Sequence, residues 1–182
     1  MWIWLSVAQA SEPFERWGER PRDPALEVNV LWPFFPGGIS DVKLVAPLLR
    51  PQQDAGRGEG IAGLHSDFGW GPLTRPVDSY GKVRFLGVKL GWRQFVAWGL
   101  HLDLTANVGW RHEEGNVYDG TTLDSLNARA WTFAGWQVDL TERVYTNVRG
   151  GVGVHLIRVG DPYADTERPL APGGDWNIGV RF

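Results

Sequence analysis

One uninterrupted alternation of apolar and polar residues limits the fold of this chain more than any other feature. Between Trp98 and Trp110 every second residue is apolar, and the residues between them are polar or glycine. Successive side chains of a β-strand point to opposite faces, so this pattern predicts a strand with one apolar and one polar face. Strands of soluble β-sandwiches usually run about five or six residues. A strand of this length is therefore unusual for a soluble sheet.

The same period of two recurs along most of the chain, with turn residues between the repeats. It predicts eight strands, over residues 26–34, 41–48, 62–70, 86–92, 98–110, 128–140, 144–156 and 176–182. The pattern is irregular at two places: apolar residues occupy both faces near residues 83–86, and Trp131 and Phe133 fall on the otherwise polar face. A β-bulge or an aromatic plug inside the fold would explain either irregularity.

The connections between the predicted strands alternate in length, as they do in barrels of the bacterial outer membrane, where short turns on one side alternate with longer loops on the other. A tight connection at Gln94 joins the fourth and fifth strands, and residues 141–143 join the sixth and seventh. Longer loops, residues 113–124 and 160–174, follow the fifth and seventh strands. The N-terminal half fits less well, because its first loop is short and its second connection is long (residues 36–38 and 50–59).

The composition excludes several classes of protein. No run of about 18 apolar residues is present, so the sequence predicts no membrane-spanning helix, whereas the strands of a barrel leave only a weak alternating signal. The formal charge of −3 provides no basic field for nucleic acid. The absence of cysteine excludes disulfides and thiolate metal sites. Eleven tryptophans and 24 glycines are many for a soluble domain of this size.

The N-terminus differs from the rest of the chain. Residues 1–10 (MWIWLSVAQA) are an apolar run that ends in a small-x-small pattern, which predicts the remnant of a signal peptide; because no basic residue precedes the run, an ordinary hydrophobic N-terminus is the alternative. Residues 11–24 are rich in proline and charge, and we expect them to form a periplasmic lead-in. Residues 25–182 form the predicted barrel.

The aromatic residues on the apolar faces fall into two groups. One group lies at the ends of the strands that we expect to be external: Trp32, Phe34, Phe68, Trp70 and Trp110. The other lies toward the periplasmic ends: Trp92, Trp98, Trp136 and Phe182. Aromatic rings favour membrane interfaces, so this sorting predicts two girdles around a membrane-embedded barrel.

These features together resemble the small eight-stranded outer-membrane proteins, the class that includes the OmpX, OmpW and OmpA-barrel types. The resemblance covers about residues 25–182 and includes the terminal strand 176–182 (WNIGVRF), which ends in an aromatic residue. It implies an all-β, eight-stranded antiparallel transmembrane up-and-down barrel in the bacterial outer membrane. It further implies contact with outer-membrane lipids and lipopolysaccharide, recognition of the C-terminal strand by the barrel assembly machinery, and room for an envelope protein partner.

The interior of such a barrel is about wide enough for its own side chains. The inward positions carry nearly equal numbers of acids and bases, and burial forces opposite charges to pair, which predicts a closed, salt-bridged lumen. This predicted lumen network consists of Glu27, Asp41, Lys43, His65, Asp67, Lys89, His101, Asp103, Arg111, Arg129, Asp139, Arg149, His155 and Arg181. The alternative is a narrow solute path, for which the many inward glycines would leave space.

The sequence therefore favours a barrel with a structural or interaction role and without chemistry of its own. A small-solute channel or a conduit for hydrophobic ligands is the second hypothesis. A lipid-modifying enzyme is the third, with Ser79, Asp78 and His112 as its candidate set, although serine and aspartate are also common in turns. Two inward pairs, His65 with Asp67 and His101 with Asp103, combine metal-ligand types, but such pairs are commonly core hydrogen bonds, and we expect neither a metal nor a cofactor.

Overall fold

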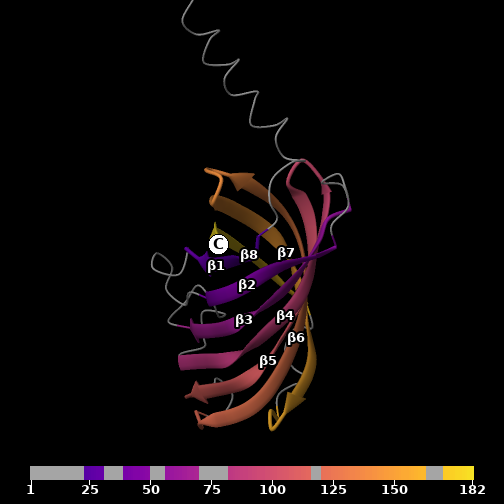
Figure 1. The fold of residues 1–182 in the computed structure, drawn as a ribbon. Coiled ribbons are helices and arrows are strands. Elements are labelled where there is room, and N and C mark those ends of the chain that lie inside the picture. The colour runs from indigo at the N-terminus through magenta and orange to yellow at the C-terminus, as the bar shows by residue number, and fades with distance from the viewer. Residues whose placement is uncertain (1–22, 31–38, 50–55, 70–81, 116–119, 163–169) are drawn as a thin grey trace, which may run out of the picture.

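Eight antiparallel strands close into a barrel in the computed structural model, which describes residues 23–30, 39–49, 56–69, 82–115, 120–162 and 170–182 (Figure 1). Each strand pairs with its neighbours in the chain, and the first pairs with the last. The strands are β1 (Ala25–Asn29), β2 (Ile39–Leu49), β3 (Gly58–Gly69), β4 (Lys82–Ala97), β5 (Leu100–Glu114), β6 (Leu123–Asp139), β7 (Val144–Val159) and β8 (Leu170–Arg181). The prediction of an all-β, eight-stranded up-and-down barrel is thus confirmed.

Alternation along the strands places most polar side chains inside the barrel and most apolar side chains outside. In β5, Asp103 is 1% exposed while its neighbour Leu104 is 60% exposed. The same contrast holds in β4, where Lys89 is buried and Leu90 is exposed. The described barrel therefore reverses the usual arrangement of a water-soluble protein, whose interior is apolar.

The connection between β4 and β5 corrects the expected position of a turn. The predicted connection at Gln94 is wrong, because β4 continues to Ala97 and the turn consists of Trp98 and Gly99. Both residues have positive φ angles, 47° and 79°, as a two-residue hairpin turn with the twist of the flanking strands requires. Trp98 continues the apolar period of the fifth strand, so the pattern alone assigned it to that strand.

Several strands are longer than the alternation indicated. The loop expected over residues 113–124 is shorter, since β5 includes Glu113 and β6 begins at Leu123. β8 likewise begins at Leu170, inside the loop expected over residues 160–174. Glycine, proline and polar residues near these strand ends obscure the apolar period, although the backbone pairing continues through them.

The irregularity near residues 83–86 is an aromatic residue that points inward. The register of β4 with β3 is continuous through this segment, and Phe85 is buried in the barrel. Trp131 and Phe133 also lie inside, where their rings stack with centroids 5.5 Å apart. A bulge does occur on β7: the pairing with β6 skips Leu156, after which Arg158 faces inward and Ile157 faces outward.

Some expectations fall on segments outside the described residues. These are the signal-peptide remnant, the lead-in up to residue 22, Trp32, Phe34, Trp70, the loop at residues 36–38, and the candidate catalytic pair Asp78 and Ser79. The side chains of Asp67 and Phe68 are likewise not described, although both residues belong to β3. Within the described ranges, no helix has the length and apolarity to cross a membrane.

Candidate functional site

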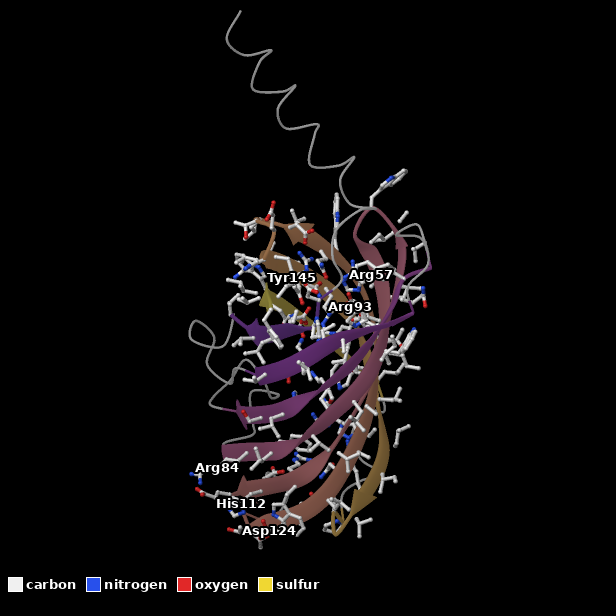
Figure 2. All side chains as sticks on the ribbon, viewed as in Figure 1. Arg57, Arg84, Arg93, His112, Asp124 and Tyr145 are labelled. Atoms are coloured by element: carbon white, nitrogen blue, oxygen red, sulfur yellow. The ribbon has the colours of Figure 1, made fainter. Side chains whose placement is uncertain are left out.

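Arg93 of β4 is the centre of the ionic network inside the barrel (Figure 2). Its Nη1 lies 2.6 Å from Glu27 Oε1 and its Nη2 lies 3.1 Å from Glu27 Oε2, so the two side chains form a bidentate pair. Its Nε donates to Asp103 at 3.1 Å, and its Nη1 is 3.5 Å from Glu59 Oε2. The guanidinium is fully buried and joins carboxylates from β1, β3 and β5.

A second guanidinium extends the network toward β8. Arg149 of β7 donates to Asp103 at 2.6 Å and to Asp175 at 2.6 and 2.7 Å. Its guanidinium also lies over the ring of Phe133, 4.4 Å from the ring centroid. Asp103 therefore connects two arginines, and His101 Nδ1 lies 2.7 Å from the same carboxylate.

Each carboxylate oxygen of Glu27 also has a second partner. The hydroxyl of Tyr145 donates a hydrogen bond to Glu27 Oε1 at 2.9 Å, and Lys43 Nζ lies 3.4 Å from Glu27 Oε2. Lys43 in turn donates to Asn177 at 2.9 Å. We call the connected set the Arg93 cluster; its members are Glu27, Lys43, Arg57, Glu59, Arg93, His101, Asp103, Tyr145, Asn147, Arg149, Asp175 and Asn177.

The charges of the Arg93 cluster balance. It contains four carboxylates (Glu27, Glu59, Asp103 and Asp175) and four bases (Lys43, Arg57, Arg93 and Arg149). Burying charges is strongly unfavourable unless they are paired and hydrogen-bonded, and here each carboxylate contacts at least one base. The cluster thus places side chains that neutralise one another in the interior of the barrel.

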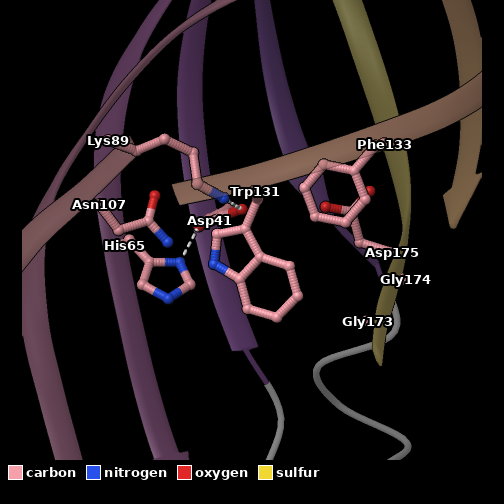
Figure 3. A pocket seen from close by; sticks show the side chains of 9 residues that line it. All are labelled: Asp41, His65, Lys89, Asn107, Trp131, Phe133, Gly173, Gly174 and Asp175. Atoms are coloured by element: carbon pink, nitrogen blue, oxygen red, sulfur yellow. Dashed lines mark hydrogen bonds and ion pairs between the residues drawn. The ribbon is translucent and has the colours of Figure 1, made fainter. Parts of the chain in front are cut away.

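A second, smaller group lies nearer the loop end of the barrel, opposite the end that carries Ala25 and Arg181. Asp41 of β2 pairs with His65 of β3 and with Lys89 of β4 (Figure 3). These three residues border a cavity of about 30 Å³ that Asn107 and Trp131 also line. Water needs roughly 10–15 Å³ per molecule by this measure, so the cavity is too small for any solute much larger than water.

Two inward glycines, Gly153 and Gly179, leave no open space beside them in the lumen. A Cβ atom on Gly179 would lie 2.1 Å from the ring of Tyr145, and one on Gly153 would lie 2.5 Å from the ring of Trp131. These glycines therefore accommodate neighbouring aromatic rings, which occupy the space that the missing side chains leave.

Among the other described members of the predicted lumen network, Arg181 contacts the Arg93 cluster, because its guanidinium lies 4.7 Å from the ring centroid of Tyr145. Arg181 also contacts Asp139 at 2.6 Å, near the end of the barrel where β1 begins and β8 ends. At the loop end, Arg111 lies 2.8 Å from Glu113 and 3.6 Å from Asp161. Arg129 lies over the ring of Phe85 at 5.8 Å from the ring centroid. His155 is partly buried, and it pairs across the sheet with Arg129.

Three of the most connected residues were absent from the predicted network. Arg93 lay beside the wrongly placed turn, Glu59 lay in a connection, and Asp175 lay between a predicted loop and the last strand. The signal for Arg93 was present, because it continues the inward series of Lys89 and Gly91 at every second residue. Extending the period of two by one residue beyond Trp92, where the predicted fourth strand ends, identifies Arg93 as an inward residue.

Of the candidate catalytic set only His112 lies in the described part of the chain, and of the two candidate metal pairs His101 and Asp103 are in contact at 2.7 Å. His112 Nδ1 lies 2.8 Å from Asp124 on the outer surface near the loop end, and its Nε2 lies 3.6 Å from Glu114 (Figure 2). His65 is buried, whereas Ser66 points to the opposite face of β3. No group of three or more potential metal ligands occurs among the described residues.

Trp110 and Trp136 have partners for their indole N–H groups, and they expose their rings on the outside of the barrel. Near the end where β1 begins and β8 ends, Trp136 donates to the carbonyl oxygen of Trp98 at 3.0 Å, and Trp98 is 75% exposed. Near the loop end, Trp110 donates to Asp124 at 3.1 Å. Phe182 is also exposed, at the end of β8. Aromatic residues thus occupy the outer surface toward both ends of the barrel.

Comparison of the chain with protein-family models, with curated proteins and with solved structures finds no match in any of the three.

Proposed function

We propose that this protein is an integral barrel of the bacterial outer membrane with a structural or interaction role and a lumen closed by its own side chains. The observation that carries this proposal is the reversed distribution of side chains: leucines and valines cover the outside of all eight strands, while charged residues are buried within. Lipid is the solvent that makes such an exterior favourable.

Two further features support a membrane location. A closed barrel satisfies the backbone hydrogen bonds of its strands internally, which a lipid environment requires. The exposed aromatic residues toward the two ends of the barrel, Trp110 on one side and Trp98, Trp136 and Phe182 on the other, correspond to two interfacial girdles. Within this proposal, outer-membrane lipids and lipopolysaccharide contact the exterior, and the assembly machinery recognises the C-terminal strand that ends in Phe182.

The closed lumen follows from the Arg93 cluster. Its members bridge the interior from β1 to β5 and from β5 to β8, and Arg93, Glu27 and Lys43 are fully buried. An ion that entered would have to separate bidentate and charge-assisted hydrogen bonds, which are among the strongest in proteins. The role of the barrel then lies in its surfaces and partners.

Heat-modifiability tests the membrane proposal most directly. The full chain is refolded into detergent and run on a gel with and without boiling. A faster-migrating unboiled band is expected. A protein that is soluble without detergent and migrates identically in both lanes would overturn the proposal.

A substitution sharpens this test. Leu104 lies in the middle of the outward apolar series of β5 and is 60% exposed. In lipid vesicles, Leu104→Arg should destabilise the barrel by about 2–4 kcal/mol, the cost of an arginine near the centre of the bilayer. The matched control Glu114→Arg, at the end of the same strand, should change the stability by less than about 1 kcal/mol. Equal effects at both positions would contradict a lipid-facing exterior.

Conductance tests the closed lumen separately. We expect no single-channel steps from the wild-type protein in planar bilayers. Reproducible steps would reject the closed lumen and favour the small-solute channel, while leaving the membrane location intact.

A further inference from the structure

The cavity lies between the Asp41 group (Asp41, His65 and Lys89) and the Arg93 cluster, and the carboxylates in its wall are paired with basic side chains. Six strands contribute to its lining: β2, β3, β4, β5, β6 and β8. Asp41 pairs with Lys89 and His65, and Asp175 pairs with Arg149 and Asn177. Because both carboxylates have bases beside them, the cavity offers no net charge that would favour a free cation or anion.

One polar atom of this wall has an unused hydrogen-bonding capacity. Asn107 of β5 is 1% exposed and lines the cavity (Figure 3). Within the described ranges of the chain, no donor lies within hydrogen-bond distance of its side-chain oxygen. Buried polar atoms in proteins almost always have a partner, so a donor in the cavity is required to satisfy this oxygen.

We infer that the cavity is a hydration site for about two water molecules. Its volume of about 30 Å³ is at least twice the roughly 10–15 Å³ that one water molecule needs. The water molecules donate to Asn107 Oδ1 and to the carboxylates of Asp41 and Asp175, and they accept from the Lys89 ammonium, which has further donors beyond its bond to Asp41.

This hydration site lies between the Asp41 group and the Arg93 cluster, and none of the ion pairs described above joins the two. Asp41, His65 and Lys89 lie on one side of the cavity, and Asp175, a member of the Arg93 cluster, lies on the other. Water between them joins both groups into one hydrogen-bonded network. Trp131 and Phe133 supply the apolar part of the wall, and their stacked rings limit the size of the cavity.

A crystal structure of the full chain in detergent, at a resolution that shows ordered water, tests this inference. Crystals soaked in rubidium bromide distinguish water from ions, because both Rb⁺ and Br⁻ scatter anomalously. We expect one or two water peaks within hydrogen-bond distance of Asn107 and no anomalous peak in the cavity. A cavity without density, or one with an anomalous peak, would overturn the inference.

A pair of variants tests the role of Asn107 itself. Asn107→Leu keeps the side-chain size but removes the hydrogen-bonding atoms, so at least one water peak should disappear. Asn127→Leu is the matched control: Asn127 is also fully buried on the inward face but does not line the cavity. Unchanged water in Asn107→Leu, or equal loss in the control, would reject the assignment. If the leucine variants fail to fold, the wild-type crystal still decides the question.

Discussion

Replacing Arg93 with methionine tests whether the ionic network holds the barrel together. The substitution keeps a long, flexible side chain but removes the guanidinium that binds Glu27, Asp103 and Glu59. Removing one partner of a buried ion pair typically costs about 3–5 kcal/mol, because the charge that remains is left uncompensated.

The carboxylates that lose Arg93 keep other basic partners, so the expected loss of stability lies at the lower end of this range. After the loss of Arg93, Glu27 keeps Lys43 at 3.4 Å, and Asp103 keeps Arg149 at 2.6 Å. Glu59 keeps its bond to Arg57. Since every carboxylate retains one basic partner, we expect Arg93→Met to lower the free energy of unfolding by about 3 kcal/mol.

Denaturant titration of the barrel in detergent micelles, followed by tryptophan fluorescence, measures this change. Arg84→Met is the matched control, because Arg84 forms a pair with Glu114 at 3.5 Å on the outer surface, where both side chains are largely exposed. Exposed pairs contribute less than about 1 kcal/mol. A loss in Arg93→Met no greater than that in Arg84→Met would refute the reasoning.

A double variant separates pairing from packing. Combining Arg93→Met with Glu27→Gln replaces the carboxylate nearest the lost guanidinium with a neutral amide. The double variant should therefore lose at least about 1 kcal/mol less stability than the sum of the losses of the two single variants. Strict additivity would mean that the side chains act through packing alone.

Three further substitutions test local features by the same titration. Gly99→Ala, at a φ of 79°, should cost about 1 kcal/mol because alanine disfavours that conformation. Gly179→Ala should cost about 1–3 kcal/mol, since its Cβ would lie 2.1 Å from the Tyr145 ring. Gly150→Ala is the control for both, because nothing lies within 4 Å of its Cβ, and a loss equal to theirs would contradict both explanations. Tyr145→Phe should cost about 1.5–3 kcal/mol by removing the donor to Glu27, and an unchanged stability would show that this bond contributes nothing.

Local pattern was sufficient to predict the strands and their two faces. The period of two fixes which residues point inward, and this holds for buried Glu27, Lys43 and Asp103 as well as for exposed Leu104. It does so because side-chain direction depends on parity along the chain wherever a strand has no bulge, as β7 has at Leu156. The pattern was weakest where an outward residue continues the period through a turn, as Trp98 does.

The sequence by itself determined the strands, the two faces and the balance of buried charge, because these properties depend on neighbouring residues and on composition. The pairing inside the lumen depended on tertiary structure: Arg93 meets Glu27 from 66 positions away, and Lys43 meets Asn177 from 134 positions away. Parity tells which side chains enter the barrel, but the stagger of the strands decides the height at which each one lies. Which acid meets which base, and where a cavity remains between them, is therefore set only when the barrel closes.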